Sequence, residues 1–316
     1  MTTTDPHTPP IIVLYGALRS GTTLFRLMLN AHPRITCRGE RDFMVDYMTF
    51  DTGSPTLDRE ALAADRIFRT SGLTVPDTDD GHAAFRDMAR QAGAGQPGQV
   101  VVLVMHRHLD RLLALCPDVR IIHLIRDPRD VARSSIGMGW AGNTWFGVDH
   151  WIGTEQAWDA HGSALPQTQV FPLHYEHLLE EPDDQLTRLC AFMGLTYDPV
   201  MLTFDQNSTY SALDPKLAYQ WRQKQTPQEV AEVEHKVGPL LAARGYAPSG
   251  HPPTAPSLLR RMVLNWTNRH HKWRLRLKRY GYVDPIQEAL ARRLGLTSLQ
   301  HAAQRRIDEK KRKRAK

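Results

Sequence analysis

Cysteine is scarce in this sequence, with three residues among 316 and no Cys-x-x-Cys pair. Cys37, Cys116 and Cys190 therefore offer neither a disulfide framework nor a zinc ligand set, and they fit a reducing compartment. Long apolar runs are also missing, since no stretch approaches the roughly 18 residues that a membrane-spanning helix needs. The opening MTTTDPHTPP lacks the basic and apolar regions of a secretory signal. We therefore expect a cytoplasmic protein without disulfides.

The net charge of +6 is distributed unevenly. Residues 1–257 contain 22 Lys+Arg and 30 Asp+Glu, a net −8, whereas residues 258–316 contain 18 and 4, a net +14. The segment PSGHPPTAPS at 248–257 has the composition of a linker. We therefore predict a folded domain over residues 1–250 and a basic helical C-terminal extension over residues 251–316.

Apolar runs typical of buried strands alternate with helical patterns. This alternation predicts an α/β fold with a P-loop-like, mostly parallel central sheet and helices on both of its faces. Pro172 indicates an edge position or a bulge for the last strand. The expected strands are 11–15, 99–105, 119–125 and 169–175. The expected helices are 22–32, 59–70, 81–92, 108–115, 183–193, 226–245 and one that begins at Pro128.

The segment GALRSGTT at 16–23 lies between a strand and a helix, as a phosphate-binding loop does. Its glycines allow a tight turn, so that the amides of residues 20–23 can point at one anion near the positive end of the helix. The spacing mimics GxxxxGK[ST], but Thr22 replaces the lysine that reaches nucleoside triphosphates. This replacement argues against hydrolysis of ATP or GTP. An ordinary glycine turn is the alternative interpretation.

A second candidate anion site is RDPRDVARS at 126–134, directly after an expected strand. Arg126 would lie at the carboxyl end of that strand, where parallel sheets bind ligands. Ser134 follows eight residues later, so a cation and a hydroxyl could converge on one phosphate. Alternatively, the segment is a solvated charged helix in which Arg129 and Arg133 pair with the two aspartates.

Together these two segments resemble the 5′-phosphosulfate loop and the 3′-phosphate motif of PAPS-dependent sulfotransferases, in the family's order and separation. The similarity extends over about residues 10–247 and includes LHYEHLLEEP at 173–182; the early stretch is most similar to tyrosylprotein sulfotransferases and their bacterial relatives. The resemblance implies transfer of a sulfuryl group from 3′-phosphoadenosine-5′-phosphosulfate (PAPS) to an acceptor hydroxyl or amine, leaving PAP, without a metal. The cofactor-binding residues that it implies are Arg19, Ser20, Gly21, Thr22, Thr23, Arg126, Ser134, Tyr175 and Ser208.

The resemblance also implies that Glu40, after the pair His32-Pro33, is the general base for the acceptor. A carboxylate within hydrogen-bond reach can take the proton that an acceptor hydroxyl loses as it attacks sulfur. A surface carboxylate paired with Arg38 or Arg41 is the alternative. Arg19 would stabilise the charge that builds on the bridging oxygen as PAP leaves.

The sequence departs from the family's pattern at VMHRH, residues 104–108. Many relatives carry a lysine there, so His106, Arg107 or His108 must supply the cation, or it is missing. His106 can also donate or accept a proton, and we count it among the catalytic residues. The His-x-His spacing suggests a metal site as well, but the sequence offers no evident third ligand, and we expect no metal.

The sequence does not identify the acceptor or the role of the basic tail. Tryptophans at 140, 145, 151 and 158 are candidates for lining an acceptor pocket, and a small molecule, glycan, lipid or peptide fits the resemblance. Residues 258–280 predict a basic helix, and a solvated structure without a special partner is the favoured interpretation. Alternatively, an amphipathic helix could lie on an anionic membrane surface such as the inner face of a cell membrane, dock on the acidic body of its own or a second protomer, or bind nucleic acid nonspecifically. No specific nucleic acid is expected, and we expect KKRKRAK at 310–316 to be unstructured.

Two other functions compete with sulfuryl transfer. A P-loop kinase would bind ATP with Mg²⁺ tightly, against which the missing lysine argues. A PAP-binding or nucleotide-binding scaffold without transfer would keep the cofactor site, and in it Glu40 would affect only stability.

Overall fold

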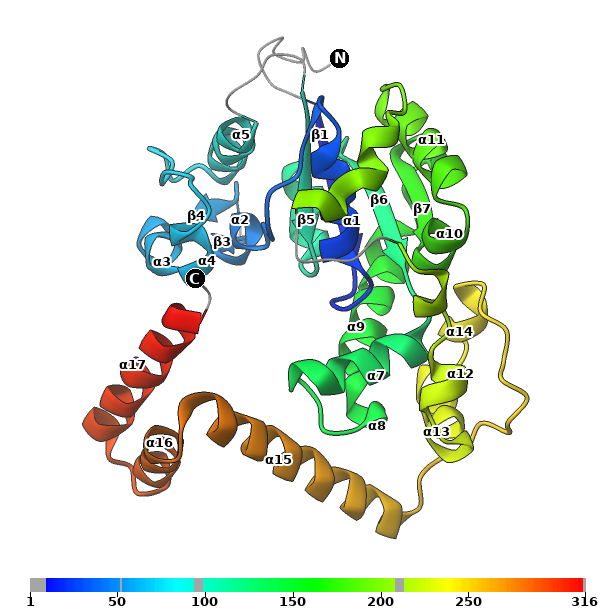
Figure 1. Cartoon of the computed structure of the whole chain (residues 1–316). Coiled ribbons are helices and arrows are strands. Elements are labelled where there is room, and N and C mark those ends of the chain that lie inside the picture. The colour runs from blue at the N-terminus through cyan, green and yellow to red at the C-terminus, as the bar shows by residue number, and fades with distance from the viewer. Residues whose placement is uncertain (1–9, 52, 94–98, 208–212, 315–316) are drawn as a thin grey trace.

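A five-stranded parallel sheet forms the centre of the computed structural model, which describes residues 10–51, 53–93, 99–207 and 213–314 (Figure 1). The strand order is β2-β5-β1-β6-β7, and every neighbouring pair is parallel. The predicted α/β class is thus confirmed, and Pro172 lies in the edge strand β7 as expected. The strands are β1 (Ile11–Gly16), β2 (Ile35–Thr36), β5 (Val100–Met105), β6 (Arg120–Ile125) and β7 (Val170–His174).

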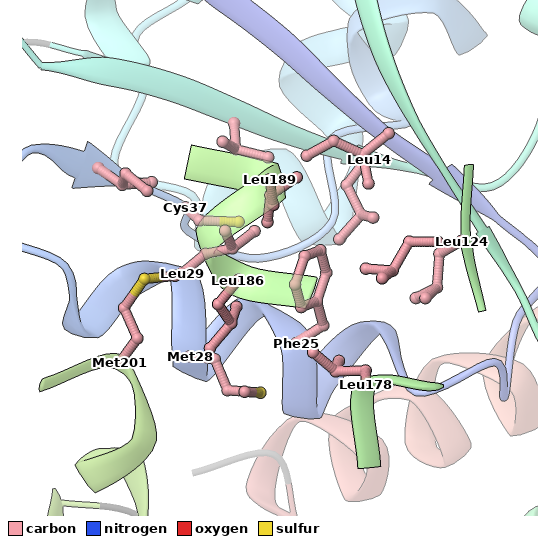
Figure 2. Packing of buried hydrophobic residues seen from close by; sticks show 14 of the residues in the cluster. Leu14, Phe25, Met28, Leu29, Cys37, Leu124, Leu178, Leu186, Leu189 and Met201 are labelled. Atoms are coloured by element: carbon pink, nitrogen blue, oxygen red, sulfur yellow. The ribbon is translucent and has the colours of Figure 1, made fainter. Parts of the chain in front are cut away.

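Both faces of the sheet are covered, because alternate residues of its strands point to opposite sides. Ile12 and Leu14 of β1 join a core cluster with α1 (Thr22–Ala31), α10 (Tyr175–Glu180) and α11 (Pro182–Met193). Figure 2 shows Phe25 of α1 in this cluster, near Leu14 and Leu189. Val13 and its alternates pack instead against α2 (Phe43–Asp46), α5 (Gly81–Ala92) and α6 (Leu109–Leu115).

Two predicted helices end earlier than expected. The helix predicted for 59–70 is divided into α3 (Arg59–Ala64) and α4 (Arg66–Arg69), because Asp65 is extended and its carboxylate accepts a hydrogen bond from the amide of Phe68 at 2.7 Å. The helix that begins after Thr226 has the predicted capping box, but α13 (Pro227–Val237) ends at Gly238. Gly238 has φ 60° and ψ −135°, a conformation that glycine alone adopts readily.

The remaining elements complete the body of the molecule and a short second sheet. Its two antiparallel strands are β3 (Met48–Thr49) and β4 (Thr56–Leu57). The other helices of the body are α7 (Pro128–Met138), α8 (Thr144–Gly147), α9 (Asp149–Ala157), η1 (Trp158–Gly162), η2 (Gln167–Gln169), η3 (Pro199–Asn207), η4 (Pro215–Leu217), α12 (Trp221–Lys224) and α14 (Leu240–Ala243).

Three helices follow residue 257, and the first of them runs along the body, where Gly142 and Asn143 contact it (Figure 1). They are α15 (Leu258–Tyr280), α16 (Val283–Arg293) and α17 (Thr297–Arg314). The helix predicted for 258–280 therefore has its expected bounds, whereas residues 310–314, expected to be unstructured, continue α17. Among the described helices, none has the length and apolar character needed to cross a bilayer. The division into a domain of residues 1–250 and an extension of residues 251–316 stays a prediction.

Candidate active site

The loop between β1 and α1 turns tightly at the carboxyl edge of the sheet. Arg19 and Gly21 have φ of 71° and 93°, and the amide of Ser20 donates to the carbonyl of Ala17 at 3.1 Å. A Cβ on Gly21 would lie 2.3 Å from the ring of Tyr175, so only glycine fits there. The buried hydroxyl of Ser20 makes no hydrogen bond within the described chain. A buried donor in that state, in a loop of this shape, suits an anionic ligand.

The second predicted anion site meets this loop. The Nε of Arg19 donates to Oγ of Ser134 at 3.0 Å, and Nη1 of Arg126 donates to the carbonyl of Arg19 at 3.0 Å. The guanidinium of Arg126 lies 4.3 Å from the ring centroid of Tyr175, and its buried Nε has no partner among the described residues. The structure therefore brings four predicted residues together at the ends of β1, β6 and β7. Ser208, also predicted here, lies outside the described residues.

Three of the charged residues after Arg126 are buried and hold the site in place, namely Asp127, Arg129 and Asp130. Arg129 is buried, and it pairs with Asp127 at 2.7 Å and with Glu234 of α13 at 2.6 Å. Asp127 also caps α7, so this segment fixes the start of that helix. The alternative of a solvated charged helix is wrong for Arg129, whose charge stabilises the fold. Arg133 is exposed.

Glu176 stabilises the segment that follows Arg126 through two buried hydrogen bonds. Its carboxyl accepts from the amide of Asp127 at 3.0 Å and from the hydroxyl of Tyr246 at 2.8 Å. Burial raises the pKa of Glu176 to about 7. Because the folded protein binds this proton more tightly than the unfolded chain, the contribution of Glu176 to stability is fully present at acid pH and is lost as pH rises through the interval between the two pKa values.

Replacing Glu176 with glutamine should remove this pH dependence, because the side-chain amide has no proton to lose. Its oxygen can still accept from the amide of Asp127, and its NH2 group can donate to the hydroxyl oxygen of Tyr246. Between about pH 4.5 and about pH 7 the free energy of unfolding of the wild type should fall, relative to the variant, by about 3 kcal/mol. Urea unfolding at several pH values measures this difference. Glu180→Gln, an exposed position of the same helix, is the control. Parallel pH profiles for wild type and Glu176→Gln would contradict the raised pKa.

Glu40 lies at the same edge of the sheet, opposite the end of β5. It forms a parallel bridge with Val104, and the amide of Arg41 donates to the carbonyl of Val104 at 2.8 Å. His106 follows β5, and its Nε2 lies 3.7 Å from Oε1 of Glu40. Its Nδ1 lies 2.7 Å from the carbonyl of Gly16, which can only accept, so Nδ1 carries a proton. Nε2 therefore faces Glu40.

Each member of this pair favours the charged form of the other. The nearby imidazole of His106 outweighs burial and lowers the pKa of Glu40. Burial alone would lower the pKa of His106, but the carboxylates of Glu40 and Asp42 outweigh it, so that pKa is raised. When it is protonated, His106 places a positive charge beside the phosphate loop.

The two other candidates for that cation point elsewhere. Arg107 donates from Nε and Nη2 to the carboxylate of Asp46, at 2.8 and 2.5 Å. His108 also faces Asp46, with Nε2 at 3.5 Å from the carboxylate oxygen Oδ1. Of these three side chains, it is His106 that faces the loop.

Metal ligation is possible with a set of residues that the His-x-His spacing does not indicate. Donor atoms of Glu40, Asp42 and His106 lie within 4.8 Å of one another, while His108 faces away from them. Asp42 was not foreseen as a neighbour. Its Oδ1 accepts from the amides of His106 at 2.7 Å and Arg107 at 3.2 Å, and these bonds account for its buried position. The expectation of no metal stays a prediction.

A pocket of about 280 Å³ opens beside Glu40. Thr22 and Thr23 of the phosphate loop form one wall, and Arg26 and Arg66 add two positive charges. Neither guanidinium makes an ion pair with any residue that the structure describes. Neither arginine could be recognised from sequence patterns, because α1 carries one and α4 the other, and no motif links them.

Two of the four candidate pocket tryptophans lie in the core. Trp151 is fully buried and donates from its indole to the carbonyl of Arg126 at 2.9 Å. Trp158 is buried and stacks on His123 at 3.8 Å between ring centroids. The prediction that these two line an acceptor pocket is therefore wrong. Trp140 is 40% exposed and lies 5.9 Å from the guanidinium of Arg19, so it does border the phosphate loop.

Comparison with known proteins gives a consistent result. Residues 10–199 match the profile of the sulfotransferase family. Protein-tyrosine sulfotransferase 2 of Gallus gallus is 23% identical over 273 residues, which cover 77% of this chain and 71% of that protein. The putative protein-tyrosine sulfotransferase of Caenorhabditis briggsae is 24% identical over 273 residues, covering 77% and 91%.

Solved structures show the same fold. The sulfotransferase domain from the curacin biosynthetic pathway superimposes with a TM-score of 0.58 at 18% identity, covering 76% of this chain and 98% of that domain. The sulfotransferase domain from the Synechococcus PCC 7002 olefin synthase gives 0.56 at 20% identity, covering 70% and 90%. The match of the family profile over more than half of the chain, together with this fold, establishes that the protein belongs to the sulfotransferase family of enzymes.

Proposed function

We propose that the protein transfers a sulfuryl group from PAPS to an acceptor hydroxyl or amine and releases PAP. The convergence of Arg19, Ser134 and Arg126 at the carboxyl edge of the sheet carries the proposal. Two anionic groups of one nucleotide would be bound there, the 5′-phosphosulfate by the loop and the 3′-phosphate by Arg126 and Ser134. The unpartnered Ser20 hydroxyl and Arg126 Nε fit such a ligand, since both are buried donors.

In this proposal PAPS supplies an activated sulfuryl group whose leaving group is the 5′-phosphate of PAP. The acceptor oxygen or nitrogen bonds to sulfur as the bond from sulfur to that phosphate oxygen breaks, and Glu40 takes the acceptor's proton. Its lowered pKa keeps Glu40 ionised and able to accept. Arg19 and the protonated His106 stabilise the charge that develops on the departing oxygen.

The pocket beside Glu40 is the proposed acceptor site, and its charge suggests the kind of acceptor. Arg26 and Arg66 are positive and make no ion pair with the described residues, so an acceptor with an anionic group next to its reacting hydroxyl would be favoured. The relatives named above are protein-tyrosine sulfotransferases, and a peptide is therefore one acceptor to test.

Replacing Arg66 with glutamine should raise the KM for a tyrosine peptide flanked by glutamates by about 10-fold, because one charge-assisted contact is lost. The same peptide with glutamines in place of the glutamates should show little change. PAP affinity should stay at the wild-type value, since Arg66 lies outside the phosphate loop. A loss of equal size for both peptides would contradict an electrostatic role, and Arg69→Gln on the same helix is the matched control.

Transfer of labelled sulfur from PAPS tests the proposed function directly. Wild-type protein should label an acceptor from a panel of phenols, sugars, lipids and tyrosine peptides, without added metal. Binding of PAP with no labelled product across the panel would favour a scaffold. Tight binding of ATP with Mg²⁺ and none of PAP would favour a kinase.

A further inference from the structure

Helix α15 is fixed to the body along one face. The Nδ2 of Asn143 donates to the carbonyl of Leu264 at 2.8 Å, and the amide of Gly142 donates to Oδ1 of Asn268 at 2.7 Å. A Cβ on Gly142 would lie 2.5 Å from the Cα of Asn268, so the backbones meet closely. At its amino end, Arg260 pairs with Glu232 of α13 at 2.8 Å. This face of α15 is therefore covered by the body of the protein.

The opposite face of α15 is an apolar stripe in solvent. Leu259, Met262 and Trp266 are exposed by 76%, 68% and 65%, and their spacing of three and four residues places them on one side of the helix. Their neighbours in the stripe are the exposed Leu258, Val263 and Trp273. A contiguous apolar surface of this kind marks an interaction site.

Cations border the stripe on both sides. α15 contains eight Arg or Lys residues and no acidic residue. Five of them are exposed and have no ion pair within the described chain: Arg261, Arg269, Lys272, Arg274 and Lys278. A recess of about 430 Å³ lies between α15 and Gly139, and Arg269, Lys272 and Trp273 are part of its lining. The recess is open to an anionic group.

We propose that α15 docks on an anionic phospholipid bilayer, lying in the plane of the interface. The stripe of Leu, Met, Val and Trp enters the boundary between headgroups and acyl chains, and the bordering cations contact lipid phosphates. Two tryptophans in the stripe suit that boundary, because the indole ring is amphipathic. Arg269 and Lys272 hold a headgroup phosphate in the recess.

The charge and apolar surface of α15 favour an anionic bilayer over a second copy of α15 or a nucleic acid. Two copies of α15 that buried their stripes against each other would bring the five cations of one helix that lack an ion pair among the described residues close to those of the other. A nucleic acid would neutralise the cations but leave the exposed leucines and Met262 in water. An anionic bilayer satisfies both features at once.

Co-sedimentation with vesicles tests this proposal on the full-length protein. Wild type should bind vesicles of phosphatidylglycerol and phosphatidylcholine and not vesicles of phosphatidylcholine alone, with weaker binding as salt rises. The double variants Met262→Ser/Trp266→Ser and Arg269→Gln/Lys272→Gln should each lower the partition coefficient by about 10-fold or more. Arg86→Gln/Arg90→Gln, which removes two exposed charges from α5, should leave it unchanged.

PAP titration of the same samples separates docking from the sulfotransferase proposal, since the α15 variants should keep wild-type PAP affinity. The docking proposal is wrong if the wild-type protein does not bind anionic vesicles at low salt. It is also wrong if the apolar variant binds them as wild type does, because binding would then be simple adsorption to a polyanion. A dimer in sedimentation that the apolar variant abolishes, without vesicle binding, would assign the stripe to a second copy.

Discussion

Replacing Arg126 with alanine should lower the affinity for PAP by about 100-fold, which is the largest binding effect that we expect. Its guanidinium has two roles at the carboxyl edge of the sheet. Nη1 holds the carbonyl of Arg19 at 3.0 Å, and the buried Nε is directed to no described partner. The variant therefore loses a phosphate contact and also loosens the turn that orients Arg19. Isothermal titration with PAP in metal-free buffer measures the effect.

Arg133→Ala is the matched control, because Arg133 lies in the same motif and is exposed. It should bind PAP as tightly as wild type, and circular dichroism should show that both variants fold. Equal affinity for Arg126→Ala and wild type would remove Arg126 from the cofactor site. If wild type itself binds no PAP, the proposed function is wrong, and ATP with Mg²⁺ becomes the ligand to test.

The convergence of the two anion motifs was predictable because both follow apolar strands directly. Residues that follow parallel strands meet at one edge of the sheet, so Arg19 and Arg126 had to be neighbours once β1 and β6 were recognised. Tyr175 follows β7 in the same way. The fold class followed from the same alternation, without any knowledge of side-chain contacts.

The acceptor side of the site was less predictable because it depends on irregular segments. Strand β2 has two residues, and Glu40 reaches the edge of the sheet through a single bridge to Val104. Arg66 reaches the same pocket only because Asp65 divides the predicted helix, and that break depends on a cap rather than on helix propensity. Apolar periodicity carries no signal for either arrangement.

The prediction that Trp151 lines an acceptor pocket was wrong for a different reason. Trp151 follows the 3′-phosphate motif closely, which suggested a pocket, but its indole satisfies the carbonyl of Arg126 from inside the core. A buried tryptophan needs one hydrogen-bond acceptor, and the strand end offers one. Its role is thus to fix the strand end that presents Arg126, which the sequence alone does not distinguish from contact with a ligand.

Replacing Glu40 with glutamine should lower kcat for sulfuryl transfer by about 100-fold to 10,000-fold, while PAP affinity stays within a few-fold of wild type. Glutamine keeps the shape of the side chain and its position opposite Val104, but it cannot take a proton. Transfer of labelled sulfur measures kcat, and titration measures PAP binding. Glu60→Gln, an exposed carboxylate of α3, is the control and should be fully active.

The pH dependence of the wild type gives a second readout of the same role. Because the nearby imidazole of His106 lowers the pKa of Glu40, activity should persist into the acid range and fall only below the ordinary pKa of a glutamate. Replacing His106 with asparagine removes that partner, so the acid limb should move to higher pH. If Glu40→Gln instead lowers the free energy of unfolding and leaves kcat unchanged, Glu40 is structural. A different group must then accept the proton, and the scaffold interpretation fails as well, because transfer would still occur.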